Sequence, residues 1–304
     1  MTIKIRGAVP VLHTPINVEG AVDEAGLERL VDYLVQKPIG GLWVLGTGGE
    51  DMNLTYAQRL AVARRVVAAN QGRVPLVMGA GFFCMDDSLA FMRDLAKLDV
   101  AAIHVMPYHP LFSLDRLAWF YKKLADESPR PLWMYTSANW CRHIPPEFVA
   151  AMKGYPNIAG VKYSTSNAVH IGKVAALADE NFNVLAAVVS TFYSSLCLGV
   201  DGATSSVGSP LPEAMIEIYD HFKAGQHAEA LLAQRKLNEF LDAWPKGPAK
   251  DNFLKGAEEK SILFMRGICE RYTTSYYRDC TDEEVAQLRV AVERYYPQLL
   301  PKDG

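Results

Sequence analysis

Short apolar segments alternate with longer segments of helical period along the first three quarters of the chain. The short segments are apolar along most of their length instead of alternating with polar residues, which predicts strands buried on both faces, as in a parallel sheet. The predicted strands are Ala8–His13, Gly41–Leu45, Leu76–Gly79, Ala101–Met106, Leu132–Tyr135, Ile158–Lys162, Val184–Val188 and Ala203–Ser206.

The segments between these strands have the spacing of amphipathic helices. Asp23 and Thr55 are expected to be N-caps, and Thr55-Tyr-Ala-Gln58 has the spacing of a capping box. The predicted helices are Asp23–Gln36, Thr55–Asn70, Asp86–Leu98, Leu114–Glu127, Pro146–Lys153, Ala168–Leu177, Thr191–Leu198 and Pro212–Ala224.

Eight strand–helix units in residues 1–225 are typical of a (β/α)₈ TIM barrel, an α/β fold. A doubly wound sheet is the alternative, but it usually stops at five or six strands. Residues 226–304 predict a C-terminal helical extension with helices at Ala228–Leu241, Glu258–Tyr272 and Asp282–Tyr295. No charge block or flexible linker marks an independent second domain.

The charge balance narrows the classes of function. The chain has 31 Lys and Arg against 34 Asp and Glu, and its basic residues form no run longer than a pair. This pattern argues against binding of nucleic acid or of an anionic membrane surface. The uncharged segment Val184–Val200 contains several Ser and Thr residues, which favours a buried strand and helix over a membrane span.

The cysteine pattern and the N-terminus indicate the compartment. The chain has five cysteines, an odd number, and no CxxC pair. Reduced thiols in a cytoplasmic protein are the expectation. The apolar stretch near the N-terminus is too short for the core of a signal peptide.

Three strand ends carry candidate reactive residues, and in a barrel such ends meet at one mouth. Lys162 ends an apolar strand, where desolvation would lower its pKa and make it a nucleophile towards carbonyls. The alternative is a lysine that only extends to solvent. Tyr135 is a candidate proton carrier if its hydroxyl meets a partner such as Thr47, or else an aromatic that caps the core.

The glycine-rich turn Gly46–Gly49 is the third candidate feature. Its backbone N–H groups are candidates for an anion-binding nest, and a plain tight turn is the alternative. It is not a P-loop, because no Gly-Lys-Ser/Thr follows. His104 and His109 fit no common two-histidine metal motif, so we expect a packed histidine, a loop histidine and no metal.

The order of these motifs resembles the dihydrodipicolinate synthase/N-acetylneuraminate lyase family, the class I pyruvate-dependent aldolases. The resemblance covers nearly the whole chain and rests on Gly46-Thr-Gly-Gly-Glu50, Met106-Pro-Tyr108, Tyr135, Gly160-Val-Lys162 and Asp201-Gly-Ala-Thr-Ser205. It implies a barrel with a C-terminal helical extension, assembled as a homotetramer (a dimer of dimers). It also implies a Schiff base between a lysine and a 2-oxo acid, without metal or organic cofactor.

By this resemblance, the catalytic residues are Lys162, which matches the family's Schiff-base lysine, and Tyr135 and Thr47, which match its proton relay. The second hydroxyl of the family loop is missing, because that position is Gly48. The N–H groups of Gly48 and Gly49 are expected to bind the carboxylate of the 2-oxo acid instead.

Several departures from the family pattern bear on the substrate. His109 stands where dihydrodipicolinate synthases have a tyrosine that reaches a neighbouring subunit. Trp140, or Arg142 in a shifted alignment, replaces an arginine that binds the aldehyde's carboxylate. Apolar residues Phe82, Phe83, Met85, Val188 and Val189 occupy loop positions that are polar in relatives. The expected substrate-binding residues are Gly48, Gly49, His109, Phe83, Trp140, Val188 and Thr204.

The resulting prediction is a Schiff-base lyase, an aldolase or hydratase-aldolase, that makes or breaks a C–C bond next to a 2-oxo acid such as pyruvate. Its partner substrate is predicted to be an aromatic or apolar aldehyde. Alternatives are a 2-keto-3-deoxy sugar-acid aldolase or dehydratase, a 4-hydroxy-tetrahydrodipicolinate synthase, and, of another class, a catalytically silent ligand-binding barrel. A metal-dependent aldolase is disfavoured because the sequence lacks a ligand cluster.

Overall fold

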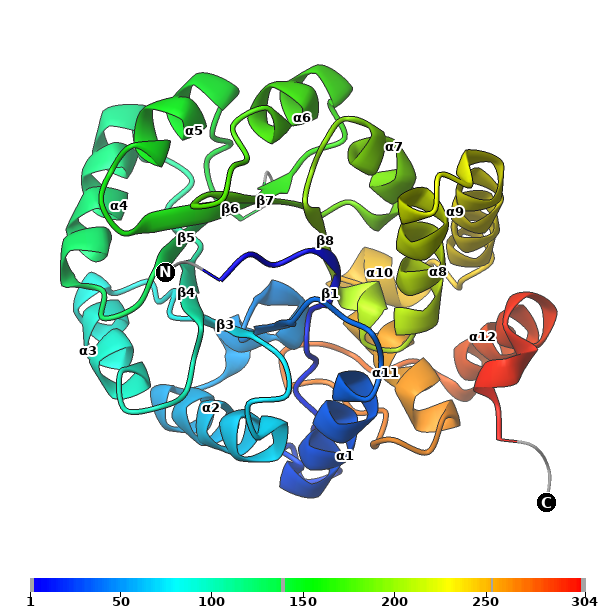
Figure 1. The fold of residues 1–304 in the computed structure, drawn as a ribbon. Coiled ribbons are helices and arrows are strands. Elements are labelled where there is room, and N and C mark those ends of the chain that lie inside the picture. Colours follow the sequence, from blue (N-terminus) through cyan, green and yellow to red (C-terminus); the bar gives the residue numbers. More distant parts are fainter. Residues whose placement is uncertain (1–2, 138–139, 253, 302–304) are drawn as a thin grey trace.

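The computed structural model describes residues 3–137, 140–252 and 254–301. Its centre is one sheet of eight parallel strands in the order β1-β8-β7-β6-β5-β4-β3-β2 (Figure 1). The strands are β1 (Gly7–Pro10), β2 (Leu42–Val44), β3 (Leu76–Gly79), β4 (Ala102–Val105), β5 (Leu132–Ser137), β6 (Ile158–Ser164), β7 (Asn183–Ala186) and β8 (Gly202–Ser205). Just beyond β1, a parallel bridge joins Val11 to Trp43, and the Leu12 N–H donates to the Trp43 carbonyl (2.8 Å), which closes the ring.

Helices surround this ring and follow the strands in turn (Figure 1). They are α1 (Glu24–Val35), α2 (Tyr56–Asn70), α3 (Met85–Leu95), α4 (Leu114–Glu127), α5 (Pro146–Lys153), α6 (Ala168–Ala175), α7 (Phe192–Cys197) and α8 (Pro212–Lys223). Asp23 caps α1, and Thr55 and Gln58 form the predicted capping box of α2. The predicted (β/α)₈ barrel is therefore confirmed, and with it the burial of both strand faces.

Two hydrophobic layers follow from this arrangement. A large outer layer lies between strands and helices. A smaller inner layer fills the barrel, and it includes Val9, Trp43, Trp133, Tyr135 and Leu185. The inner layer supports the side chains at the barrel mouth from below, so the groups that end β5 and β6 stand on a packed floor.

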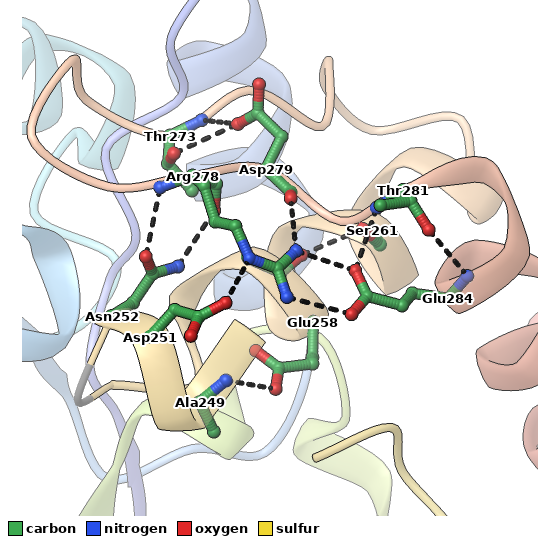
Figure 2. A network of polar contacts seen from close by, with 11 residues as sticks. Ala249, Asp251, Asn252, Glu258, Ser261, Thr273, Arg278, Asp279, Thr281 and Glu284 are labelled. Carbon is green, nitrogen blue, oxygen red and sulfur yellow. Dashed lines mark hydrogen bonds and ion pairs between the residues drawn. The ribbon is translucent and has the colours of Figure 1, made fainter. Parts of the chain in front are cut away.

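The C-terminal extension consists of α9 (His227–Asp242), α10 (Gly247–Asn252), α11 (Gly256–Met265) and α12 (Asp282–Tyr295), beside α8 and α1 in Figure 1. Arg278 joins two of these helices, since its guanidinium donates to Asp251 of α10 (2.6 Å) and to both carboxylate oxygens of Glu284 in α12 (2.8 and 2.9 Å) (Figure 2). The division of the chain at residue 225 stays a prediction.

Two details of the extension differ from the prediction. The segment after Trp244 contains the short helix α10, because proline is tolerated in the first turn of a helix and Pro248 lies there. The helix predicted to reach Tyr272 ends at Met265, because Gly267 adopts a φ of 70° and its N–H caps the carbonyl of Phe264. Among the described residues, no helix is long and apolar enough to cross a membrane.

Candidate active site

Lys162, Tyr135 and Thr47 form a continuous polar chain at the carboxyl ends of β6, β5 and β2. The strand register places Tyr135 directly opposite Lys162. The Lys162 Nζ donates to the Tyr135 hydroxyl (3.1 Å), which is 2.9 Å from Thr47 Oγ1. The structure thus brings together the three residues predicted to be catalytic.

The surroundings of Lys162 favour its neutral amine. Its side chain is 5% exposed, and Nζ lies 5.2 Å from the centre of the Trp43 ring. Burial lowers the pKa of Lys162 to about 7, although the carboxylate of Asp51 acts in the opposite direction. Burial also raises the pKa of Tyr135, so this residue is a neutral phenol. The site therefore holds an amine with a lowered pKa in contact with a neutral hydroxyl.

A cavity of about 140 Å³ opens over these groups. Thr204 of β8 lines it and is fully buried. Within the described part of the chain, Thr204 Oγ1 has no hydrogen-bond partner. A buried hydroxyl without a partner is costly, which makes Thr204 a candidate for binding a ligand group in this cavity. The cavity is lined by Val11, Thr47, Gly48, Tyr135, Lys162, Ser164, Ala187, Thr204, Ser205, Ser206 and Leu254.

The glycine turn Thr47–Gly49 is a single 3₁₀ turn that packs tightly on its neighbours. A β-carbon at residue 48 would lie 2.7 Å from Cβ of Ser206, so a side chain there would force the turn or Ser206 to shift. The Gly49 N–H donates to the Gly46 carbonyl (2.8 Å) within the turn. The turn itself uses the Gly49 N–H, and Gly49 as a carboxylate contact stays a prediction. Gly48 lines the cavity.

A second cavity, of about 480 Å³, shares Ala187, Ser205, Ser206 and Leu254 with the first. It extends towards α9 and α11 of the C-terminal extension. Its remaining wall is partly apolar, with Val188, Val189, Val207 and Leu241, and partly polar, with Ser190, Asn238, Asp242, Lys255 and Glu259. Of the predicted apolar group, Val188 and Val189 thus line a cavity adjoining the one over Lys162.

The other predicted substrate residues line neither cavity. Phe83 is 69% exposed, and its carbonyl contacts His109 Nε2 (3.0 Å) in the loop after β4. Trp140 is half-buried and packs against the inner hydrophobic layer. The guanidinium of Arg142 donates to the Phe112 carbonyl at the surface. The role of His109, Phe83 and Trp140 as substrate contacts stays a prediction. Within one chain, these residues line neither cavity near Lys162.

Phe82 has a packing role in this structure. Its ring stacks on Tyr56 (5.5 Å) and on the guanidinium of Arg59 (4.0 Å) beside α2. His104 is also a packing residue, since it stacks on Trp43 (4.0 Å) and burial lowers its pKa to about 3. In the parts of the chain that are described, no three His, Cys, Asp or Glu side chains gather as metal ligands.

Sequence reasoning missed a buried group around Asp51, next to the glycine turn. Tyr108 donates to Asp51 Oδ2 (2.8 Å), and Arg59 Nη1 lies 3.5 Å from the same oxygen. Burial raises the pKa of Asp51, while Arg59 opposes the shift. The signal available in the sequence was Asp51 itself, an acid directly after the predicted loop.

A second missed group belongs to α11. Glu258, Glu259, Lys260 and Ser261 are all buried, which is unusual for charged residues. Lys260 forms an ion pair with Glu50 (2.6 Å), and Glu259 accepts from the Ser206 hydroxyl (2.8 Å). Four consecutive polar residues carry no amphipathic pattern, so no local pattern indicated contacts with the barrel mouth.

Comparison of the chain with known protein families identifies the class of enzyme. The model of the dihydrodipicolinate synthetase family matches residues 4–255. The chain belongs to this family. Members of the dihydrodipicolinate synthase/N-acetylneuraminate lyase family are class I lyases that act through a lysine Schiff base and use pyruvate. The chain is thus an enzyme of this class.

Relatives and solved structures support this assignment. The chain is 28% identical over 245 residues to a 4-hydroxy-tetrahydrodipicolinate synthase of Shewanella piezotolerans, covering 79% of this chain and 82% of the relative. It resembles a prophage protein of the dihydrodipicolinic acid synthase family from E. coli K12, solved with pyruvate, with a TM-score of 0.88, 22% identity and coverage of 95% and 98%. The N-acetylneuraminate lyase of Proteus mirabilis matches with a TM-score of 0.87, 22% identity and coverage of 97% and 99%. At these identities the structural matches establish the fold.

Proposed function

We propose that Lys162 forms a Schiff base with a 2-oxo acid such as pyruvate, and that the enzyme makes or breaks a C–C bond next to it. The observation that carries this proposal is the buried chain Lys162–Tyr135–Thr47 under a cavity, with the pKa of Lys162 near 7. A neutral amine is nucleophilic, and a neutral phenol next to it carries protons.

The steps follow from these contacts. The Lys162 amine attacks the ketone carbon, and Tyr135, relayed by Thr47, moves one amine proton to the oxygen to give a carbinolamine. A second proton, from the Tyr135 hydroxyl, lets this oxygen leave as water, and the charged iminium remains. In cleavage, the C3–C4 bond breaks, its electron pair enters the iminium to give an enamine, and the C4 hydroxyl returns a proton to Tyr135 as C4 becomes an aldehyde. Protonation of the enamine at C3 and hydrolysis then release pyruvate. In synthesis, the same enamine attacks the aldehyde.

Thr204 is the side chain that we expect to bind the carboxylate of the 2-oxo acid. Gly48 carries no hydroxyl and the Gly49 N–H is already used, whereas Thr204 Oγ1 is buried and free among the described residues. We propose that Thr204, with the Gly48 N–H, holds this carboxylate in the 140 Å³ cavity. No metal or organic cofactor takes part in these steps.

The distal part of the substrate is proposed to enter the second cavity, with an aromatic or apolar aldehyde as the partner. Val188, Val189 and Leu241 support an apolar partner because they form the apolar part of its wall. Asn238, Asp242 and Lys255 on the same cavity favour a second candidate, a 2-keto-3-deoxy sugar-acid aldolase or dehydratase. Dihydrodipicolinate synthesis has less support, since Arg142 is engaged at the surface.

Two experiments test this function. Incubation with pyruvate and borohydride should add one reduced pyruvoyl unit to the Lys162 peptide, and labelling that persists unchanged in Lys162→Ala would refute the role of Lys162. The second experiment is a competition in the condensation direction with pyruvate, between benzaldehyde, glyceraldehyde and a carboxylated semialdehyde. We expect benzaldehyde to have the highest kcat/KM, and a tenfold advantage for either polar aldehyde would replace the apolar assignment.

We also propose a cytoplasmic homotetramer, a dimer of dimers. Exposed apolar side chains near the barrel mouth, such as Phe83 and Leu111 (93% exposed), support burial against another copy. All five cysteines are free thiols, which suits a reducing compartment. Light scattering after gel filtration should give the mass of four chains, and a monomer at micromolar concentration would argue against the assembly.

A further inference from the structure

The pairing between β4 and β5 ends just before Tyr135. β5 pairs with β4 up to the level of Val105 and continues beyond it along β6. In this ladder the Ile103 N–H donates to the Pro131 carbonyl (2.9 Å), so four residues further on the N–H of residue 107 would donate to the Tyr135 carbonyl. Residue 107 is a proline, which has no N–H. The ladder therefore cannot continue, and the backbone of Tyr135 needs other partners on this side.

The hydroxyl of Tyr121 supplies those partners. Tyr121 belongs to α4 and is fully buried in the outer hydrophobic layer. Its oxygen accepts from the Tyr135 N–H (3.2 Å), and it lies at donor distance from the carbonyls of Tyr135 (3.1 Å) and Val105 (3.2 Å). Burial raises the pKa of Tyr121, so its hydrogen stays on the oxygen. One hydroxyl thus bridges β4 and β5 where their own pairing has ended.

These contacts hold the backbone on both sides of the Tyr135 α-carbon. The N–H belongs to the peptide group before Tyr135 and the carbonyl to the peptide group after it. The direction of the phenol depends on these two peptide groups, and its oxygen has to meet Lys162 Nζ (3.1 Å) and Thr47 Oγ1 (2.9 Å). A displacement of about 1 Å at such a point can cost about 10²-fold in rate.

We propose that Tyr121 is a positioning residue, whose hydroxyl bridges β4 and β5 and so directs the Tyr135 phenol towards Lys162. This inference rests on the proposed function, in which Tyr135 moves the protons of Schiff-base formation. Tyr121 lines neither cavity, so it acts through Tyr135 and not on the substrate. The alternative is that the hydroxyl only satisfies buried backbone groups, whose loss would weaken the fold without moving the phenol.

The test starts from Tyr121→Phe, which removes the hydroxyl and keeps the ring. The probe reaction is the exchange of the methyl hydrogens of pyruvate for deuterium in D₂O, followed by NMR, because it needs the Schiff base and the enamine but no aldehyde. Rates are expressed per chain that borohydride traps with pyruvate after long incubation, so unfolded chains do not count. The exchange rate per trapped chain should fall by about 10- to 100-fold, while the half-saturating pyruvate concentration changes little.

The same substitution in a Tyr135→Phe chain separates positioning from folding. The phenol hydroxyl is absent there, so Tyr121→Phe should cause almost no further loss of exchange rate. Two residues that act through one group are non-additive in this way, whereas independent effects add. A loss from Tyr121→Phe as large in this background as in the wild type would show that Tyr121 does not act through Tyr135, and would overturn the inference.

Tyr163→Phe is the matched control, because Tyr163 is also buried, adjoins Lys162 in β6 and donates to one backbone carbonyl, that of Ile144 (3.1 Å). It should keep the wild-type exchange rate. An unchanged rate in Tyr121→Phe, or a Tyr121→Phe chain that traps no pyruvate, would give the hydroxyl a role in folding alone and would also overturn the inference. Failure of the wild type to trap pyruvate would instead overturn the proposed function.

Discussion

The fraction of neutral amine at Lys162 depends on two opposing effects. Burial lowers the pKa of this side chain, and the nearby Asp51 carboxylate raises it. A lysine in water has a pKa of about 10.4 and is almost entirely an ammonium at pH 7. Burial lowers the pKa of Lys162 to about 7, although Asp51 favours the charged form. The neighbouring Tyr135 hydroxyl accepts from Nζ, so the amine is held in place while it stays neutral.

The first prediction concerns pH. Because the pKa of Lys162 is lowered, the neutral amine accumulates as pH rises through about 7. The rate of pyruvate trapping by borohydride should therefore rise with a single apparent pKa near 7 and level off above it. Initial rates measured across neutral pH, with borohydride in excess, check this. A trapping rate that rises only around pH 10.4, about the pKa of an ordinary lysine, would contradict the lowered value.

The second prediction concerns Tyr135. Tyr135→Phe removes the hydroxyl between Lys162 and Thr47, so turnover should fall by about 10²–10⁴ while pyruvate still binds. Steady-state turnover and pyruvate binding by calorimetry separate the two effects. Tyr163→Phe is a matched control on β6, because its hydroxyl donates to the Ile144 carbonyl (3.1 Å) away from the cavity. Near-normal turnover in Tyr135→Phe would assign the proton transfer to another group.

At the scale of elements, the strand ends could be predicted from the sequence and the turns between them only in part. Apolar runs fixed the places of Lys162 and Tyr135, since parallel strands bring their carboxyl ends to one mouth. The substrate residues were harder, because a loop residue's direction depends on packing that has no local pattern. Phe82 shows this, since its ring stacks on Tyr56 of α2 and not towards Lys162.

The glycine turn and β8 are coupled, which gives the third prediction. Gly48→Ala would place a β-carbon 2.7 Å from Ser206 Cβ and 3.2 Å from Val11 Cγ1, so the turn has to shift. We expect a loss of unfolding free energy of about 1–3 kcal/mol. In a Ser206→Gly background the obstructing atom is gone and the lost Ser206–Glu259 hydrogen bond is common to both chains, so Gly48→Ala should cost much less there. Urea unfolding measures both variants.

Gly154→Ala is the control for this pair. It has an ordinary φ of −79° at the end of α5, and nothing lies within 4 Å of an added β-carbon. Its unfolding free energy should stay the same or rise slightly. Equal stability of Gly48→Ala and the wild type would show that the turn tolerates a side chain, and the missing hydroxyl would then need another explanation.

At the scale of the whole molecule, the C-terminal extension contacts the loop that follows the glycine turn. Glu50, which follows the glycine turn, pairs with Lys260 of α11 and accepts from the Thr274 N–H (2.7 Å). Asn53, one turn further along, donates to the Thr274 hydroxyl (2.9 Å). The sequence predicted helices in the extension but not these contacts, because residues more than 200 positions apart share no local pattern. The loop that carries Thr47 is consequently held from both sides, by the barrel and by the extension.

The last prediction follows from this connection. Lys260 is 0% exposed and Glu50 is 1% exposed. Burial raises the pKa of Glu50, but Lys260 and Thr274 together lower it, so the carboxylate is charged and depends on the lysine. Lys260→Met should therefore cost about 3–5 kcal/mol of unfolding free energy and slow pyruvate trapping, because Glu50 is left as an unpaired buried charge.

Glu50→Gln in the Lys260→Met background removes that charge and keeps an acceptor for the Thr274 N–H. The double variant should recover much of the stability, since replacing both members of a buried pair costs far less than removing one. Urea unfolding gives the coupling between the two residues, and trapping rates show whether the glycine turn is restored with it. Additive losses in the double variant would mean that the ion pair contributes nothing beyond its separate side chains. The extension would then support the barrel without positioning the loop that carries Thr47.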